Sequence, residues 1–145
     1  MAHNFTFGIE EEYFLIDAET KRIAPYMPAE FLAAANLATD GHVCGEFLQS
    51  QIEVVTAPQT SLTGARAELR RLRQTVSAIG AEYGLSILAA GTHPTALWGD
   101  ALQTPKDRYD LVMNDLQMIG QRNMLCGMHV HVELPDPDER VDVMM

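Results

Sequence analysis

The sequence predicts an α+β fold in which helices cover one side of a sheet whose other side is polar. Strand-like runs, such as residues 5–17 and 126–134, alternate apolar or aromatic residues with charged or imidazole side chains. The run after Ser61 instead spaces its apolar residues three and four positions apart, as an amphipathic helix does. With 145 residues, the chain has the length of a single domain with one core.

The composition narrows the classes of partner and compartment. A formal net charge of −10 argues against a nucleic-acid backbone or an acidic membrane as a partner. No apolar run reaches the length of a membrane span, and the first residues lack the pattern of a signal peptide. Cys44 and Cys126 show no CxxC spacing, so neither a zinc site nor a disulfide framework is supported. We therefore expect a cytoplasmic protein with reduced thiols.

The first predicted strand, residues 5–17, carries three consecutive carboxylates in its middle. Side chains alternate in a strand, so Glu10 and Glu12 project to one side and Glu11 to the other. Two carboxylates on one face repel each other unless a cation lies between them, and a divalent metal ion is the obvious candidate. A solvated strand face or a charged edge strand that prevents pairing is the alternative interpretation.

Residues 28–37 read as a helix and residues 39–41 as a turn, and residues 43–57 are strand-like again. A tight turn at Gln49-Ser50 would place Glu46 and Glu53 directly opposite each other on one face of a hairpin. A straight strand would point them to opposite faces, and a bulge would bring them together again. The sequence leaves these three arrangements open.

The clearest predicted helix begins at Ser61 and ends at Gly84. Its polar face carries four arginines, which we interpret as a solvated surface without chemistry: Arg66, Arg70, Arg71 and Arg73. A short buried strand, residues 85–90, then leads into a turn that contains His93, where a binding residue can be held rigidly. Another helix is predicted from Thr104, with apolar residues through Ile119 on its inner face.

Strict alternation returns in residues 126–134, with His129, His131 and Glu133 on one face. The other face, Met128, Val130 and Val132, is expected to pack against a helix layer. Asp136-Pro137-Asp138-Glu139 has the composition of a helix start. Because the apolar pattern after it stops at Met145, we expect residues 1–145 to be the N-terminal part of one larger domain, cut within a helix.

These strand faces together form an oxygen-rich set with a few imidazoles, which suits Mg²⁺ or Mn²⁺ better than zinc. Each member alone has an ordinary explanation. A histidine on a strand is often a satisfied polar residue, and Glu53 in its apolar run is open to a salt bridge with a helix arginine.

Four segments carry a resemblance to a known family: G-I-E-E-E-Y, E-F-L-Q-S-Q-I-E-V-V-T-A-P, G-T-H-P and G-M-H-V-H-V. In this order they resemble the glutamate–cysteine ligase type 2 family, the YbdK-like carboxylate–amine ligases. The resemblance implies the catalytic fold of glutamine synthetase and the guanidino kinases. In that fold, a curved antiparallel sheet holds ATP, metal ions and substrate on its concave face, and helices pack on the other.

The resemblance also implies roles for individual residues. It places five residues at Mg²⁺, with Mn²⁺ as a substitute: Glu10, Glu12, Glu46, Glu53 and His129. It places His93 and His131 near the cofactor ATP, and it assigns no catalytic side chain. The implied reaction is the phosphorylation of the γ-carboxyl of glutamate by ATP, followed by attack of the amine of cysteine on the acyl phosphate. The products are γ-glutamylcysteine, ADP and phosphate.

Family members are about twice this length or more, so we expect the chain by itself to have weak or no ligase activity. Its exposed sheet edges could pair with a second copy of the chain, so a homodimer is possible. Two alternatives remain: a non-catalytic metal- or ligand-binding module, and a metal-dependent hydrolase centred on His129 and His131. ATP dependence separates the ligase from the module, and a preference for zinc over magnesium would favour the hydrolase.

Overall fold

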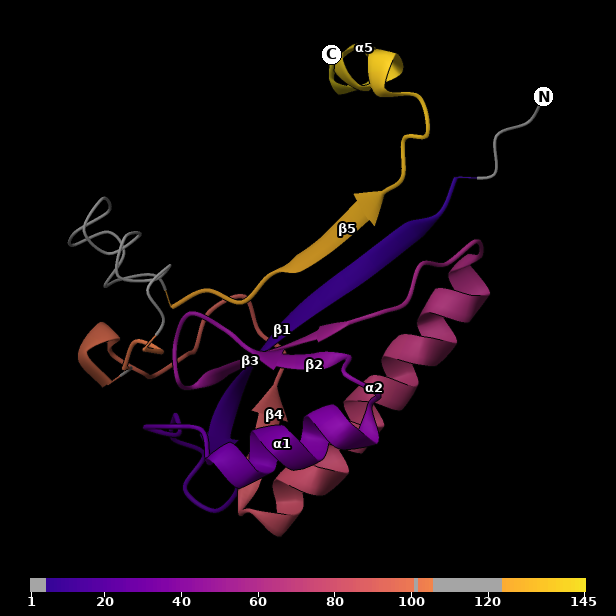
Figure 1. The fold of residues 1–145 in the computed structure, drawn as a ribbon. Coiled ribbons are helices and arrows are strands. Elements are labelled where there is room, and N and C mark those ends of the chain that lie inside the picture. The colour runs from indigo at the N-terminus through magenta and orange to yellow at the C-terminus, as the bar shows by residue number, and fades with distance from the viewer. Residues whose placement is uncertain (1–4, 101, 106–123) are drawn as a thin grey trace.

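A long central strand organises the fold. The computed structural model describes residues 5–100, 102–105 and 124–145. Its sheet has five strands, and β1 pairs with three of the others, always antiparallel (Figure 1). Along one edge of β1 lies β3, which in turn pairs with β2. Along the other edge, β5 pairs with the first half of β1 and β4 with the second half. The strands are β1 (Phe7–Asp17), β2 (Val43–Gly45), β3 (Gln51–Val55), β4 (Leu85–Leu88) and β5 (Met128–Val132).

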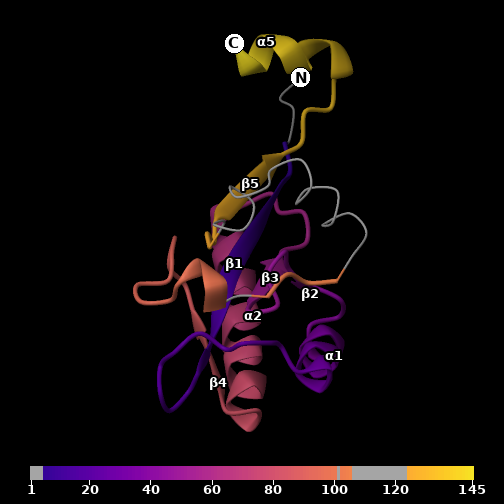
Figure 2. The ribbon, with the colours of Figure 1, turned by 90° about the vertical axis from the view of Figure 1, so that its left-hand side faces the viewer.

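Two helices, α1 (Ala29–Ala38) and α2 (Leu62–Glu82), pack on one side of this sheet (Figure 2). The Ser61 side chain caps α2 by accepting the backbone N–H of Gly64 at 3.1 Å. The helix ends before Gly84, whose φ of 68° is easily adopted by glycine. The core between helices and sheet contains Tyr13, Leu15, Ala24, Phe31, Ala35, Val43, Ile52, Val54, Leu69, Leu72, Val76 and Leu85. The predicted fold class, an antiparallel sheet with helices on one face, is confirmed.

The other face of the sheet is polar only along part of β1. Glu10 and Glu12 lie in its first half, whereas Phe14 and Ile16, farther along on the same face, are buried. These two residues join a second apolar cluster with Phe47, Leu48, Met124 and Cys126. The expectation of a wholly polar face is therefore wrong for the second half of β1, because loops cover it.

The strand-like segment 43–57 forms a hairpin of β2 and β3 rather than one straight strand. Cys44 lies opposite Glu53, and Gln51 donates its backbone N–H to the Leu48 carbonyl at 2.9 Å. That bond closes a tight turn with Gln49-Ser50 at its centre, but the strand register is shifted, so that Cys44 rather than Glu46 lies opposite Glu53. Glu46 and Glu53 share a face, as the hairpin alternative predicts, but they are diagonal rather than directly opposed.

The apolar face of β5 differs from the prediction. Met128, Val130 and Val132 are 61%, 54% and 57% exposed and do not face a helix layer. The cause is that β5 pairs with the first half of β1, whereas α2 packs mainly against β3 and β4.

The chain ends in a 3₁₀ turn, η2 (Pro137–Glu139), and a short helix, α5 (Arg140–Met144). Asp136 caps this element by accepting the N–H of Asp138 at 2.9 Å, so the predicted helix start is confirmed. Both views place α5 beyond the end of β5, away from α1 and α2 (Figures 1 and 2). Another 3₁₀ turn, η1 (Trp98–Asp100), precedes the region of the helix predicted from Thr104, and that region falls largely outside the described residues. No helix among the described residues is long and apolar enough to cross a membrane.

Candidate metal centre

Strand register gathers the predicted metal ligands on the side of the sheet away from the helices. Glu12 of β1 lies directly opposite Glu53 of β3. Glu10 lies opposite His129 of β5, and Gly8 lies opposite His131. Directly paired residues of antiparallel strands project to the same face, so this register brings residues far apart in sequence together. The two resulting groups are a carboxylate cluster, Glu12, Glu46 and Glu53, and an imidazole cluster, Glu10, His129 and His131.

In the carboxylate cluster, one oxygen of each side chain lies within 4.8 Å of the others. Two contacts orient these groups. A Glu12 oxygen, Oε2, accepts the backbone N–H of Gly127 at 2.9 Å, and Oε1 of Glu53 lies 3.4 Å from the Cys44 thiol that donates to it. All three carboxylates are partly buried, so solvent screens their mutual repulsion incompletely.

The electrostatics of Glu53 show the cost of this crowding. Burial raises the pKa of Glu53, three nearby carboxylates raise it further, and the hydrogen bond from the Cys44 thiol lowers it. The net shift is upward, so ionised Glu53 is less stable here than in water. A divalent cation among the three carboxylates would reverse this balance.

In the imidazole cluster, both histidines contact the same oxygen of Glu10. Oε2 of Glu10 lies 2.9 Å from His131 Nε2 and 3.3 Å from His129 Nδ1. The hydrogen bond with His131 is the largest cause of the lowered pKa of Glu10; burial acts against it, and His129 adds a further lowering. His131, which the resemblance places near the nucleotide, therefore lies among metal-type donors together with His129.

The two donor clusters differ in the divalent ions that they suit. Ligand oxygens around Mg²⁺, at about 2.1 Å from the ion, are separated by about 3 to 4.2 Å. The carboxylate cluster comes close to that spacing without rearrangement of the backbone. Carboxylates suit Mg²⁺ and Mn²⁺, and imidazoles also suit Mn²⁺ and other transition metals. The residues present thus fit the metal ions that the sequence predicts.

His93 lies apart from both clusters. Its side chain is buried, and its Nδ1 accepts the backbone N–H groups of Thr95 at 3.2 Å and Ala96 at 2.9 Å. Its ring meets the edge of Phe14 with ring centroids 5.8 Å apart, in the second apolar cluster. These contacts hold the His93 side chain in place after β4, and its contact with a nucleotide stays a prediction.

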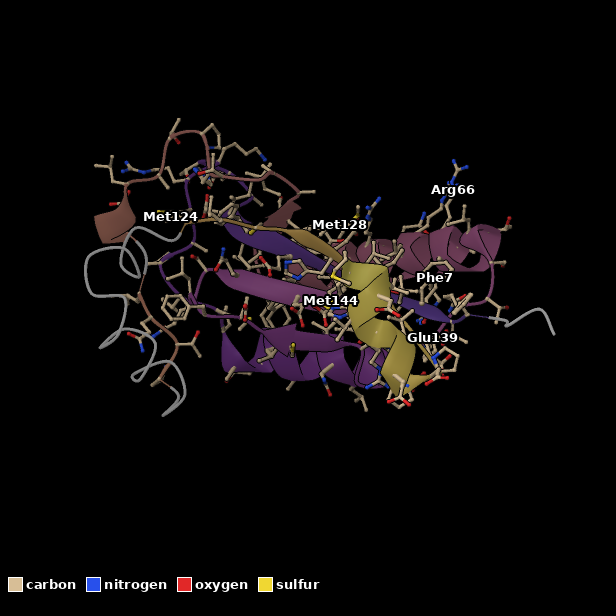
Figure 3. All side chains as sticks on the ribbon, turned by 90° about the horizontal axis from the view of Figure 1, so that it is seen from above. Phe7, Arg66, Met124, Met128, Glu139 and Met144 are labelled. Carbon is tan, nitrogen blue, oxygen red and sulfur yellow. The ribbon has the colours of Figure 1, made fainter. Side chains whose placement is uncertain are left out.

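Sequence reasoning missed one ion pair on the helix side. Glu11 projects toward α2, as its parity predicts, and pairs there with Arg73. The interpretation of Arg73 as a purely solvated arginine is therefore wrong. Arg66, by contrast, projects away from the sheet (Figure 3). The salt bridge suggested between Glu53 and a helix arginine is also wrong, because Glu53 faces away from α2 and its hydrogen-bond partner is Cys44.

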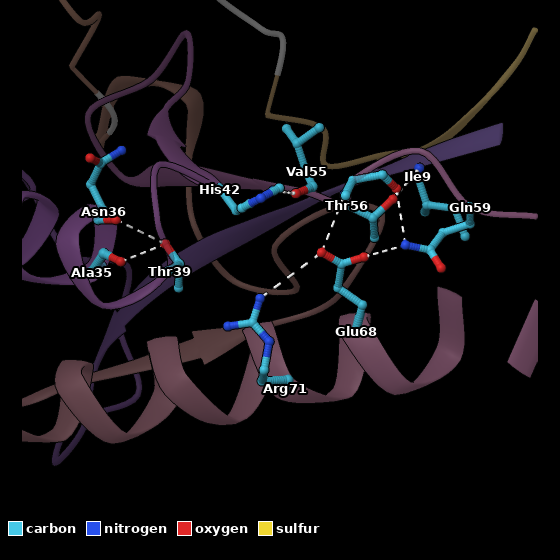
Figure 4. Close-up of polar contacts among 11 residues, drawn as sticks. Ile9, Ala35, Asn36, Thr39, His42, Val55, Thr56, Gln59, Glu68 and Arg71 are labelled. Atoms are coloured by element: carbon cyan, nitrogen blue, oxygen red, sulfur yellow. Dashed lines mark hydrogen bonds and ion pairs between the residues drawn. The ribbon is translucent and has the colours of Figure 1, made fainter. Parts of the chain in front are cut away.

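A further set of contacts fixes the end of β3 against β1 and α2 (Figure 4). Thr56 accepts the N–H of Ile9 at 2.9 Å through its hydroxyl. Glu68 of α2 accepts the N–H of Ala57 at 3.2 Å and the side-chain amide of Gln59 at 2.6 Å. The T-A-P segment after β3 is therefore held by polar contacts from two elements, which supports the strand that carries Glu53.

Gly127 leaves room for His129. A Cβ added at Gly127 would lie 3.1 Å from His129 Nε2, whereas one at Gly91 would meet nothing within 4 Å. We expect Gly127→Ala to push the imidazole off Glu10 and to weaken Mn²⁺ binding about 10-fold, comparable to the loss of an orienting contact. A Mn²⁺ titration monitored by electron paramagnetic resonance would measure the effect, with Gly91→Ala as the matched control. Equal affinity in both variants would contradict the prediction.

Comparison with known proteins decides the family. The family described as glutamate-cysteine ligase family 2 matches residues 6–145. This chain belongs to that family. A relative from Bradyrhizobium sp. (strain ORS 278), named "Putative glutamate--cysteine ligase 2", is 54% identical over 140 residues, which are 97% of this chain and 34% of the relative. A relative of the same name from Rhodospirillum rubrum is 44% identical over 144 residues, which are 97% of this chain and 37% of the relative. The family predicted from the four motifs is confirmed, and the chain spans about a third of the length of these relatives.

Two solved structures share the fold of this ligase-family chain. Glutamate–cysteine ligase from Francisella tularensis, solved in complex with AMP, matches with a TM-score of 0.70 at 17% identity, over 98% of this chain and 29% of that protein. A bifunctional glutathione synthetase from Pasteurella multocida matches with a TM-score of 0.68 at 18% identity, over 97% of this chain and 18% of that protein.

Proposed function

We propose that this chain supplies a metal-binding face to an ATP-dependent ligase that joins the γ-carboxyl of glutamate to the amine of cysteine. The observation that carries the proposal is the carboxylate cluster, whose oxygens lie within 4.8 Å of one another beside a second cluster of metal-type donors. Membership of the family and the names of the relatives support the choice of reaction.

The charge of the face supports the need for metal ions. The clusters contain four carboxylates, and the whole chain carries a formal net charge of −10. Such a surface strongly repels a nucleoside triphosphate unless cations lie between the surface and the phosphates. Glu12, Glu46 and Glu53 would hold one Mg²⁺, and Glu10 with His129 and His131 would hold a second ion. Bound Mg²⁺ supplies positive charge to the transferring phosphoryl group, where catalysis depends mostly on positioning and charge stabilisation.

The protein residues have orienting roles in this proposal. The Gly127 N–H and the Cys44 thiol aim two of the carboxylates, and the strand register sets the distance between the two clusters. His93 and His131 stay proposed contacts of the nucleotide. We assign no side chain as a nucleophile, because the amine of the second substrate attacks the acyl phosphate and phosphate leaves as the C–N bond forms.

An ADP-release assay of the full-length parent tests this proposal. We expect turnover only when ATP, Mg²⁺, glutamate and cysteine are all present, with γ-glutamylcysteine as the product. We expect the 145-residue chain alone to give little turnover, because it spans about a third of the relatives' length. Product formation without ATP would contradict the ligase, and binding of metal without nucleotide dependence would favour a non-catalytic module.

The imidazole cluster supports one second candidate, a metal-dependent hydrolase. Two imidazoles and one carboxylate are also a ligand set for a hydrolytic zinc ion that activates water. Thermal stability with Zn²⁺ and with Mg²⁺ separates the candidates. We expect the ligase to respond to Mg²⁺ in the presence of ATP, and a much larger stabilisation by Zn²⁺ alone would favour the hydrolase.

A further inference from the structure

Directly behind the metal-binding face, a carboxylate of β1 is tied to helix α2. The Glu11 side chain is 8% exposed and receives two donors from one guanidinium. Arg73 donates through Nε to Glu11 Oε2 at 2.8 Å and through Nη2 to Oε1. The Tyr13 hydroxyl donates to Oε2 as well, and Arg73 Nε lies 3.2 Å from that hydroxyl. This group, Glu11, Tyr13 and Arg73, is called the rear clamp below.

The rear clamp has a defined geometry. The two guanidinium nitrogens of Arg73 contact both oxygens of the buried Glu11 carboxylate. A two-point bond between a planar guanidinium and a carboxylate fixes direction as well as distance. The clamp therefore sets the position of the β1 backbone at Glu11 relative to α2.

That position lies between the two clusters. Glu10 belongs to the imidazole cluster and Glu12 to the carboxylate cluster, and Glu11 separates them in sequence. Like Glu10, Glu11 is paired on both sides, and it lies opposite Val54 of β3 and Met128 of β5. Any shift or twist of the strand at this point moves both metal-side carboxylates relative to their partners on β3 and β5.

We propose that Arg73 is a positioning residue for the metal-binding face. By holding Glu11 against α2, Arg73 fixes the β1 backbone and so the positions of the Glu10 and Glu12 carboxylates relative to their partners on β3 and β5. It also pairs with the middle one of three consecutive carboxylates, so that Glu11 adds no unpaired charge behind the face. This inference depends on the proposed function for the identity of the bound ion, and on the described contacts for the rest.

A matched pair of variants tests the proposal. Arg71 lies on the same helix with the same 50% side-chain exposure, but its partner is Glu68 of α2 at 4.0 Å rather than a residue of β1. We expect Arg73→Met to weaken Mn²⁺ binding about 10-fold, the lower end of the loss seen when a direct outer partner of a metal ligand is removed, because Arg73 acts on Glu10 and Glu12 only through the β1 backbone. We expect Arg71→Met to bind Mn²⁺ like the unmodified chain. Free Mn²⁺ is measured by electron paramagnetic resonance, and circular dichroism checks that both variants fold.

A double variant separates positioning from simple stabilisation. Arg73→Met alone leaves a buried unpaired charge, which can prevent folding. Glu11→Met with Arg73→Met removes both charges and so keeps the fold, but it also removes the two-point bond. We expect this double variant to bind Mn²⁺ about 10-fold more weakly than the unmodified chain. Affinity equal to that of the unmodified chain, in the double variant or in Arg73→Met, would overturn the proposal.

A measurement without metal distinguishes a failure of the metal assignment from a failure of the positioning role of Arg73. The ¹⁵N chemical shifts of the His129 and His131 imidazoles, at fixed pH, report their contacts with Glu10. We expect these shifts to change in Arg73→Met, or in the double variant, and to stay unchanged in Arg71→Met. If the unmodified chain bound no Mn²⁺ but the shifts changed in this way, the metal assignment would fail and the positioning role would stand. Unchanged shifts would overturn the positioning role.

Discussion

Replacing Glu53 with glutamine is expected to change metal binding and stability in opposite directions. Metal affinity should fall by about 100-fold or more, because the variant loses a ligand where even an orienting contact is worth about 10- to 100-fold. In the full-length ligase that we propose for this segment, the same substitution should remove turnover with little loss of fold. The metal-free chain, however, should gain about 0.5 to 1 kcal/mol in free energy of unfolding at pH 7, because repulsion with Glu12 and its neighbours disappears.

The gain in stability should depend on pH with a definite sign. The pKa of Glu53 in the folded protein lies above its ordinary value of 4.5, so folding favours the protonated form. The penalty is absent below the unfolded-state pKa and develops as pH rises through the folded-state pKa. The advantage of Glu53→Gln should therefore vanish in acid and be complete at neutral pH.

Urea denaturation at several pH values, with and without Mn²⁺, measures both parts of this prediction. Glu133→Gln is the matched control, because Glu133 bonds to the Thr6 hydroxyl at 2.6 Å outside both clusters. A loss of stability at pH 7 together with unchanged Mn²⁺ affinity in Glu53→Gln would refute the assignment of this residue.

Leu72→Ala is expected to give the largest loss of stability. The Leu72 side chain is fully buried between α2 and the sheet, so its truncation removes apolar contacts and leaves a cavity. Such changes cost about 2 to 5 kcal/mol, which is a large fraction of the roughly 5 to 15 kcal/mol that stabilises a typical domain.

The same substitution at Leu62, on the same helix, is the control for Leu72→Ala. Leu62 is 79% exposed, so Leu62→Ala should change the free energy of unfolding by less than about 0.5 kcal/mol. Urea denaturation followed by circular dichroism compares the two variants. Similar losses in both would mean that the core does not lie where the structure places it.

Residue patterns predicted the parts of the site that depend on local periodicity. The two-residue alternation in β1 placed Glu10 and Glu12 on one face and Glu11 on the other, and the structure confirms both assignments. The three- and four-residue spacing after Ser61 predicted α2 and its cap. These features follow from backbone geometry within one element, so neighbouring residues suffice to predict them.

Contacts between elements were beyond such reasoning. The position of the turn does not by itself fix the register of β2 and β3, which pairs Cys44 rather than Glu46 with Glu53. The diagonal relation of Glu46 and Glu53 could therefore not be derived. Arg73 was one of four similar helix arginines. A signal was nevertheless present, because a carboxylate that must face the helix layer requires a cation there, and Arg73 follows the buried Leu72.

The pairing of β1 with different partners along its length has a consequence for the order in which the molecule becomes rigid. The half that pairs with β4 adjoins the helix-packed core, whereas the half that pairs with β5 carries the metal-type donors and a strand that is exposed throughout. Glu10 and His129 lie on the two strands of this outer half, and ordering the exposed strand β5 along β1 costs conformational entropy. A cation shared between them would offset that cost, and the outer half would become ordered as the ion binds. Slower amide hydrogen exchange in β5 on addition of Mn²⁺, without change in α2, would record this coupling of ion binding to local folding.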